Sequence, residues 1–159
     1  MDIKVFVEIP YGSHIKYEVD EETGELIADR ILHGANYFPF NYGFVKGTKG
    51  KDGDPLDVVL LTSQPLIAGV SIKCQVIGML EMEDEGGIDT KIIAVPVKKV
   101  DPIFGTYTKI SDIHEHTKAM IKDFFDNYKN IEPNKWVKTG EFKDAEEAEK
   151  EVEASFIKE

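Results

Sequence analysis

Cysteine is nearly absent from this sequence: Cys74 is the only one in 159 residues. A single cysteine has no partner within the chain, so an internal disulfide is impossible. Its alternation with the apolar Ile72 and Val76 instead favours a small side chain in the core. The first ten residues, MDIKVFVEIP, also lack the apolar stretch of a secretion signal. Together these absences lead us to expect a cytoplasmic protein.

Long apolar runs and an excess of positive charge are missing as well. No segment approaches the roughly 18 consecutive apolar residues that cross a bilayer as a helix, so we expect no membrane contact. The chain has 30 acidic and 19 basic residues, which gives a net charge of -11 at pH 7. Nucleic acids and anionic lipids need a basic face to neutralise their phosphates, so we expect neither as a partner. An anionic ligand would have to bring cations or meet a local basic patch.

What the sequence does contain is the composition of a globular protein. Hydrophobic residues make up 42% of the chain and charged residues 31%, far from the composition of disordered segments. A chain of this length typically forms about one domain around one core. Because no linker, repeat or low-complexity tract divides the sequence, we interpret residues 1–159 as one domain.

Alternating and continuous apolar segments predict strands through about the first hundred residues. The predicted strands cover residues 3–9, 15–19, 25–32, 42–45, 56–61, 71–80 and 89–97. A tight turn around Gly24 joins the second and third strands, which predicts a β-hairpin.

Helical periodicity is confined to the last third of the chain. Asp112 and Glu115 have the spacing of a capping box at the start of a helix. The apolar face of this helix consists of Ile121, Phe124, Phe125 and Tyr128. Asp144 and Glu147 predict the start of a second helix. The apolar stripe of that helix consists of Ala148, Val152 and Phe156. The expected fold class is therefore α+β, a barrel or curled sheet followed by two helices.

The stretch KDGDPLDVVL, residues 51–60, places three aspartates directly before an apolar segment. Asp52, Asp54 and Asp57 would repel one another without a counter-charge, and a hard divalent cation such as Mg²⁺ would relieve that repulsion. The glycine between the first two aspartates lets the backbone turn, while the following proline holds Asp54 in an extended conformation. The segment therefore has the features of a metal-binding loop.

A solvated acidic turn is the alternative to a metal site at this position, because short acidic turns are common on protein surfaces. A calcium loop of the EF-hand type is excluded, because the twelfth position counted from Asp52 is Ser63, where that loop needs glutamate. A second acidic segment, EMEDEGGIDTK at residues 81–91, again joins two predicted strands. Two acidic loops on one small β scaffold favour a site for several cations.

With these residues assembled, the chain resembles the soluble family I inorganic pyrophosphatases. Their signature has the form D-G-D-P-[apolar]-D-[apolar], and it stands here as DGDPLDV at residues 52–58. The likeness continues in order through EIP (8–10), IKYEVD (15–20), ADR (28–30), FPFNYGF (38–44), DEGG (84–87), FFDNYK (124–129), KWVK (135–138) and EASF (153–156). It thus covers nearly the whole chain.

The resemblance implies an OB-like five-stranded β-barrel with extra strands and two helices. It also implies a metal-dependent hydrolysis of inorganic pyrophosphate to two phosphates, in which water is the nucleophile. Several Mg²⁺ ions would act in each active site, and Mn²⁺ or other divalent cations could replace them. Because longer relatives form dimers and compact ones hexamers, this length makes a homohexamer the expected assembly.

Carried over position by position, the resemblance assigns roles to the acidic residues. The implied metal ligands are Asp52, Asp57, Asp84 and Asp89. Asp54 corresponds to the general base that takes a proton from the attacking water. Glu8 and Glu18 correspond to residues near the water shell of the metals.

The family's phosphate-contacting positions carry cations and phenols in this chain. These residues are Lys16, Arg30, Tyr42, Lys91, Tyr128 and Lys129. An arginine can grip phosphate oxygens with two nitrogens, whereas a lysine acts as a point charge. Lys16 and Glu18 lie two residues apart on a predicted strand, so they face the same side. One position departs from the family pattern: Phe38 stands where many relatives carry a phosphate-contacting tyrosine, and we leave it out of the site.

Two other classes of protein are weighed against the enzyme. A barrel of the OB type can bind oligonucleotides without catalysis, but the excess of acids over bases opposes that function. An acidic cation-binding protein without activity would have no need of Lys16, Arg30 and Lys129. The substitution Lys129→Ala would discriminate, because unchanged ligand behaviour would favour this third class.

Overall fold

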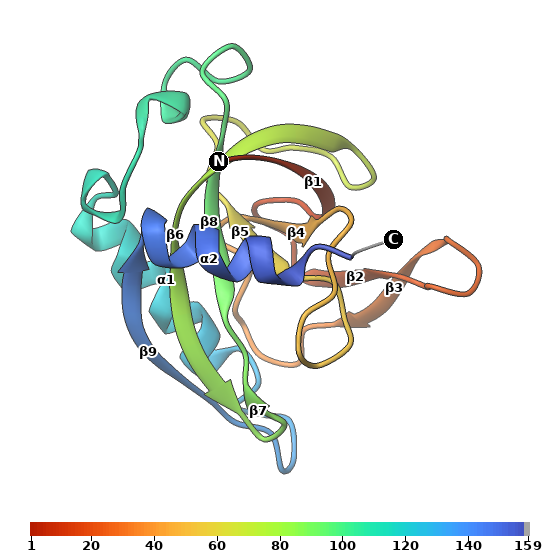
Figure 1. Ribbon diagram of the computed structural model, residues 1–159. Coiled ribbons are helices and arrows are strands. Elements are labelled where there is room, and N and C mark those ends of the chain that lie inside the picture. Colours follow the sequence, from red (N-terminus) through yellow and green to blue (C-terminus); the bar gives the residue numbers. More distant parts are fainter. Residues whose placement is uncertain (158–159) are drawn as a thin grey trace.

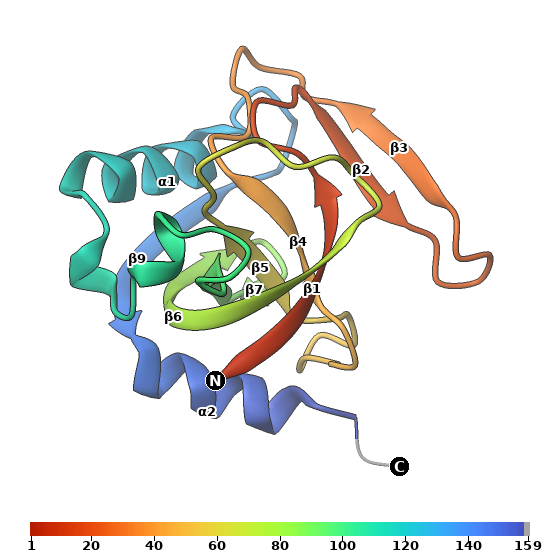
Figure 2. The same ribbon diagram turned by 90° about the horizontal axis from the view of Figure 1, so that it is seen from above.

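Five strands close into a barrel in the computed structural model, which describes residues 1–157. The strands are β1 (Asp2–Ile9), β4 (Asn41–Val45), β5 (Asp57–Leu60), β6 (Ser71–Asp84) and β8 (Lys91–Pro96). They follow the order β1-β4-β5-β8-β6, and a further pairing of β1 with β6 closes the ring (Figure 2). The expected class, α+β with a five-stranded barrel, extra strands and two helices, is confirmed.

Strand alternation separates the side chains of the barrel wall into two apolar clusters. Val58 on β5 pairs with Ile92 on β8, and both belong to a cluster that includes residues of the C-terminal helix. Their neighbours Val59 and Ile93 belong to a second cluster, which packs against the other helix. Because both faces are covered, all six residues of β8 are buried. Cys74 lies in the first cluster and is fully buried, which confirms its predicted place in the core.

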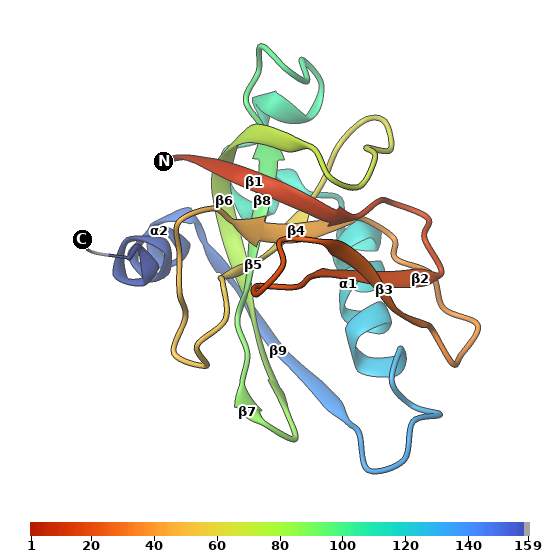
Figure 3. The same ribbon diagram turned by 90° about the vertical axis from the view of Figure 1, so that its right-hand side faces the viewer.

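Strand β6 continues beyond the barrel as a long extension that has a strand partner on each edge (Figure 3). Its outer part pairs with β7 (Gly87–Ile88) and β9 (Val137–Asp144). The prediction that the strand ends at residue 80 was wrong, because residues 81–84 continue the ladder with Met82 buried. The acidic segment 81–91 is therefore a hairpin arm rather than a loop. Strand β9 was not predicted.

The strands β2 (Ile15–Val19) and β3 (Leu26–Ile31) form a separate two-stranded sheet, which confirms the predicted hairpin. Gly24 has a positive φ of 75° in the connecting turn, a conformation that glycine adopts without strain. The hairpin projects from the side of the barrel (Figure 2). A hydrogen bond at 3.0 Å joins the hairpin to the barrel, from the Val19 N–H to the carboxylate of Glu8.

Two α-helices cover the barrel, α1 (Glu115–Asn127) on one side and α2 (Ala145–Ser155) on another (Figure 1). Two single-turn helices, η1 (Phe104–Thr106) and η2 (Ile110–Asp112), precede α1. The expected cap at Asp112 was wrong: His114 caps α1 by accepting a hydrogen bond from His116 N–H. Asp112 instead accepts from the backbone of Thr108 and Lys109.

Helix α2 begins where the sequence predicts. The Asp144 carboxylate accepts a hydrogen bond from Ala145 N–H at 3.1 Å, as an N-cap residue does. Ala148 and Val152 are fully buried, but Phe156 follows the last helical turn and is 39% exposed, so it does not complete the predicted stripe. Among residues 1–157, no helix is both long and apolar enough to cross a membrane.

Candidate active site

A cavity of about 510 Å³ lies where the barrel, the hairpin β2–β3 and the C-terminal end of α1 meet. Its walls include all but one of the site residues predicted from the sequence. Those residues are Glu8, Lys16, Glu18, Tyr42, Asp52, Asp54, Asp57, Asp84, Asp89, Lys91, Tyr128 and Lys129. Residues more than a hundred positions apart in the chain therefore face one space. The exception is Arg30.

The loop before β5 fixes the first aspartates by local hydrogen bonds. Asp52 accepts from Asp54 N–H at 3.0 Å, and the Asp54 carbonyl accepts from Gly50 N–H at 2.7 Å. Gly53 adopts φ of 88°, which a residue with a side chain would adopt only with strain. The turn thus presents two carboxylates side by side, and Asp57 follows on the first residue of β5.

Lys91 stands between two of the predicted metal ligands. Its Nζ lies 2.8 Å from Asp57 Oδ2 and 2.8 Å from Asp89 Oδ2, and its side chain is only 7% exposed. Burial lowers the pKa of Lys91, but these carboxylates outweigh that effect and hold the pKa well above its ordinary value. Lys91 therefore carries a positive charge that offsets the repulsion between Asp57 and Asp89.

Three carboxyl groups of the cavity wall, those of Glu8, Asp54 and Asp89, have pKa values above the ordinary ones. Burial, followed by the charge of Asp52, raises the pKa of Asp54. Burial also raises the pKa of Asp89, although Lys91 acts in the opposite direction. Glu8 is affected most: burial raises its pKa to about 7 despite the hydrogen bond from Val19 N–H. Carboxylates that are partly buried and repel one another attract cations.

The donor set fits a hard divalent cation by type. Six aspartates line the same cavity, five of them site residues predicted from the sequence, and oxygen is the ligand that Mg²⁺ and Ca²⁺ prefer. In the part of the chain that the structure describes, no three acidic, histidine or cysteine side chains converge into a closed ion cage. An open set of this kind suits Mg²⁺, which binds through one or two carboxylates and keeps several waters.

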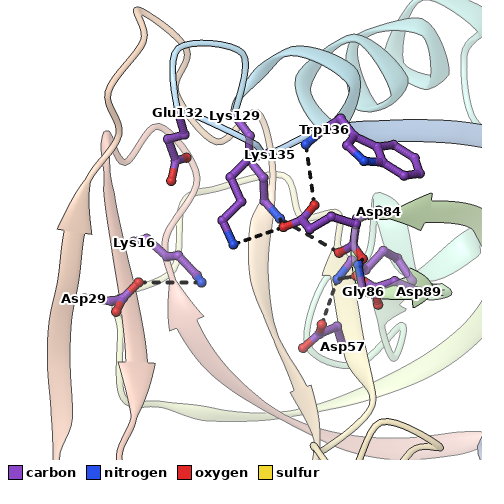
Figure 4. A network of polar contacts seen from close by, with 12 residues as sticks. Lys16, Asp29, Asp57, Asp84, Gly86, Asp89, Lys129, Glu132, Lys135 and Trp136 are labelled. Carbon is purple, nitrogen blue, oxygen red and sulfur yellow. Dashed lines mark hydrogen bonds and ion pairs between the residues drawn. The ribbon is translucent and has the colours of Figure 1, made fainter.

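Lysine side chains lie close to acidic side chains around the cavity (Figure 4), and two phenols, those of Tyr42 and Tyr128, also line its wall. Lys129 Nζ lies 3.9 Å from Asp84 and 3.8 Å from Glu85, while Lys16 Nζ lies 3.6 Å from Asp29. Burial raises the pKa of Tyr128 to about 12, so its hydroxyl stays a hydrogen-bond donor. The cavity therefore combines anionic and cationic walls, an arrangement that can hold an anion together with metal ions.

The structure does not bring Arg30 into the cavity wall. Its guanidinium donates a hydrogen bond to Glu132, and its Nε lies 3.4 Å from Asp29 Oδ2. Sequence reasoning also missed Glu85, which belongs to the DEGG segment and pairs with Lys135 at 3.2 Å. Glu132 carried no signal in the sequence, because its partner lies about a hundred residues earlier.

Phe38 lines the cavity but is almost fully buried, with 3% exposed. Its ring centroid lies 4.6 Å from that of Phe124 and 5.8 Å from that of Tyr42. The neighbouring Tyr37 is 48% exposed and lies outside the cavity wall, so its hydroxyl does not replace the missing phenol. Phe38 therefore packs against other aromatic rings where many relatives carry the tyrosine.

Comparisons with known proteins agree with this geometry. Residues 5–158 match the family model described as inorganic pyrophosphatase. The inorganic pyrophosphatase of Nanoarchaeum equitans is 54% identical over 150 residues, which cover 94% of this chain and 92% of the relative. That of Aquifex pyrophilus is 47% identical over 95% of this chain and 85% of the relative.

Solved structures of inorganic pyrophosphatases have the same fold. The enzyme from Helicobacter pylori superimposes with a TM-score of 0.94 at 46% identity, covering 97% of this chain and 91% of that one. The Coxiella burnetii structure gives a TM-score of 0.93 at 44% identity, covering 97% and 92% respectively. This chain therefore belongs to the inorganic pyrophosphatase family, whose members are metal-dependent enzymes that hydrolyse pyrophosphate.

Proposed function

We propose that this chain hydrolyses pyrophosphate with Mg²⁺ as its cofactor, by direct attack of water, and that the residues around the 510 Å³ cavity carry out the reaction. The observation that supports this proposal is that six aspartates and three lysines line one cavity. Pyrophosphate is a compact polyanion, so an acidic protein needs both metal ions and local cations to bind it. Metal ions, when bound, would neutralise charge on the substrate oxygens and lower the pKa of a nearby water.

The aspartates have two proposed roles. Asp52, Asp57, Asp84 and Asp89 hold the metals, and Glu8 with Glu18 orders the surrounding water. Asp54 is the general base that accepts a proton from the attacking water. Its raised pKa suits this role, because a carboxylate that binds a proton more readily is a stronger base.

The cations hold the phosphates. Lys16 and Lys129 reach the cavity from the hairpin and from the end of α1, so they can bind the substrate from different sides. Lys91 keeps Asp57 and Asp89 in place, and its ammonium also faces the Tyr42 ring at 5.4 Å from the centroid. Tyr42 and Tyr128 keep their protons and donate hydrogen bonds to phosphate oxygens.

The setting of the enzyme is also a proposal. The single, buried cysteine supports a cytoplasmic location for the enzyme. The net charge of -11 argues against nucleic acid as a partner. The compact length supports a homohexamer, which sedimentation equilibrium would test. A mass equal to that of one or two chains would contradict it.

Phosphate release from pyrophosphate tests the function and the metal together. We expect release with Mg²⁺, a smaller rate with Mn²⁺ and none in the presence of excess chelator. Adding Mg²⁺ back should restore the rate. Release that continues in chelator would overturn the metal requirement, and no release with any divalent cation would overturn the proposed reaction.

A further inference from the structure

Glu132 is a buried acid outside the cavity, in the segment between α1 and β9. Its exposed fraction is 8%. Burying a carboxylate is costly unless a close partner neutralises it. That partner is Arg30 on β3, whose Nη1 donates a hydrogen bond to Glu132 Oε1. Because Glu132 contacts no metal-ligand candidate in the cavity wall, the reason for its burial lies in what it does to Arg30.

Arg30 has a second acidic neighbour, Asp29, which is more exposed than Glu132. Asp29 is 35% exposed and is shared between Arg30 Nε at 3.4 Å and Lys16 Nζ at 3.6 Å. Within residues 1–157, Arg30 Nε is the only buried side-chain polar atom without a hydrogen-bond partner. Asp29 therefore lies near the guanidinium without satisfying it. Since arginine has five N–H donors, Arg30 can keep Glu132 and still take another acceptor.

The pair also joins two parts of the molecule that hold substrate-binding candidates. Arg30 pairs with Lys16 across the hairpin, and cross-strand partners point to the same face. Glu132 N–H donates to the Lys129 carbonyl at 2.9 Å, so Glu132 closes a turn that begins at Lys129. Figure 4 shows Glu132 and Lys129 in the upper part of the view, above Lys16 and Asp29 on the hairpin. The ion pair thus fixes one cationic wall relative to the other.

We propose that Glu132 is a positioning residue for pyrophosphate: it holds one side of the Arg30 guanidinium while a phosphate oxygen replaces Asp29 on the other. The two acids then have opposite effects, because Glu132 orients Arg30 for the substrate whereas Asp29 competes with the substrate for it. This inference rests on the proposed function and on the phosphate-contacting role that the family resemblance implies for Arg30.

The test compares Glu132→Gln with Asp29→Asn in steady-state hydrolysis at fixed free Mg²⁺. We expect Glu132→Gln to raise KM for pyrophosphate about three- to tenfold with less than about a twofold change in kcat, since it removes one charge-assisted hydrogen bond. Asp29→Asn should leave KM equal or lower. A KM for Glu132→Gln within the error of the natural value, or a parallel rise in both variants, would overturn the proposal.

Asp126→Asn is the matched structural control. Asp126 lies in the last turn of α1, near Glu132 in the sequence. Its carboxylate accepts a hydrogen bond from the Thr139 N–H at 2.8 Å and another from the Thr139 hydroxyl at 3.0 Å. Its loss should lower the thermal unfolding midpoint without changing KM. If KM rises equally in Asp126→Asn and Glu132→Gln, Glu132 acts only on general stability and the proposal fails.

Arg30→Lys separates failure of this inference from failure of the proposed role of Arg30. We expect Arg30→Lys to raise KM and Glu132→Gln to add less than about a twofold rise in that background, because the two residues act as one unit. If Arg30→Lys has the same KM as the natural chain, Arg30 does not contact the substrate. A raised KM in Arg30→Lys with a natural KM in Glu132→Gln would overturn the positioning role alone.

A binding measurement covers variants too inactive for kinetics. Calorimetry with a bisphosphonate, in which CH₂ replaces the bridging oxygen, reports affinity without turnover. The dissociation constant should rise by the same factor as KM in Glu132→Gln and should not rise in Asp29→Asn. Equal dissociation constants for the natural chain and Glu132→Gln would contradict the proposal.

Discussion

The barrel and the hairpin β2–β3 support the two sides of the cavity in different ways. All six residues of β8 are buried, whereas none of the residues of β2 (15–19) or β3 (26–31) is. The barrel therefore holds Asp57 and Lys91 on strands with little freedom to move. The hairpin carries Lys16 on a sheet that has no buried residue and is held by the packing of Tyr17 on the core and by a few polar contacts. Weakly packed elements open more easily.

This contrast suits the different demands of like and unlike charges. Carboxylates that bind metals repel one another, so they need a scaffold that keeps them in place. Cations that bind phosphate can adjust to the substrate, and an element of low local stability permits this. The comparison predicts that changes on the barrel side affect chemistry and folding, while changes on the hairpin side affect substrate affinity.

The largest effect is expected from Asp54→Asn on the acidic side. Loss of the proposed general base should lower phosphate release by about 10²- to 10⁴-fold, while magnesium binding measured by calorimetry persists. Glu81→Gln is the control, because Glu81 pairs with Lys143 at 3.6 Å outside the cavity wall. A natural rate in Asp54→Asn would remove Asp54 from the reaction.

Paired substitutions of isoleucine test the difference in packing directly. Ile93→Ala removes a fully buried side chain from β8 and should lower the free energy of unfolding by about 2–5 kcal/mol. Ile31→Ala removes a side chain that is 64% exposed on β3 and should change it by less than about 0.5 kcal/mol. Urea unfolding measures both. Equal losses would show that the hairpin is as tightly packed as the barrel.

Lys129→Ala tests the cationic side. The loss of one charged phosphate contact should lower kcat/KM by about ten- to a hundredfold, with magnesium binding and the unfolding midpoint unchanged. Lys122→Ala is the matched control, because Lys122 lies on α1, outside the cavity wall, with its Nζ 5.5 Å from the Phe142 ring centroid. The same kinetic loss in both variants would argue against a specific role for Lys129.

The last prediction concerns the junction between barrel and hairpin. Burial raises the pKa of Glu8 from 4.5 to about 7, so between these values the folded chain binds a proton that the unfolded chain releases. In metal-free buffer, the contribution of Glu8 to stability should be full below pH 4.5 and should decline as the pH rises through 7.

Glu8→Gln provides the reference for this pH dependence, because glutamine stays neutral and still accepts a hydrogen bond from Val19 N–H. The difference in unfolding free energy between the natural chain and the variant should shift in favour of the variant from pH 5 to pH 8. A constant difference across that range would show that Glu8 has an ordinary pKa.

The local pattern of apolar residues in the sequence predicted the strands in which buried side chains alternate, as in β1, or in which every side chain is buried, as in β8. Strand β1 buries Ile3, Val5 and Val7 at every second position, and this alternation is plain in the sequence. Strand β9 was missed because VKTGEFKD contains a glycine, several charges and no buried residue. Its partner, the outer part of β6, is what makes it a strand. Long-range pairing of this kind leaves little local signal.

The cap of α1 shows a similar limit. Asp112 and Glu115 have capping-box spacing, but Asp112 accepts hydrogen bonds from the preceding turn and leaves the cap to His114. The Asp112 carboxylate is thus already used in the turn before α1, and side-chain hydrogen bonds to nearby backbone groups compete with helix capping in this way.

The candidate site was named mainly by its motif, and the structure adds its electrostatics. The pattern DGDPLD identifies Asp52, Asp54 and Asp57, but it contains no information that Lys91 lies between two of the acids. The pairing of Arg30 with Glu132 was equally inaccessible, because it depends on how the hairpin meets the end of α1.

Closure of the barrel has a consequence for how copies of this chain meet at high concentration. Each of the five barrel strands has a partner on both sides, so none offers an open ladder to a neighbouring molecule. Outside the ring, β7 is only two residues long, and β9 carries the exposed charges of Lys138, Glu141 and Lys143. Short or charged edges resist strand-to-strand aggregation. Closure of the barrel that fixes the acidic wall therefore also removes its open edges, so the longest edges left for strand pairing between copies are those of the hairpin β2–β3 and of β9.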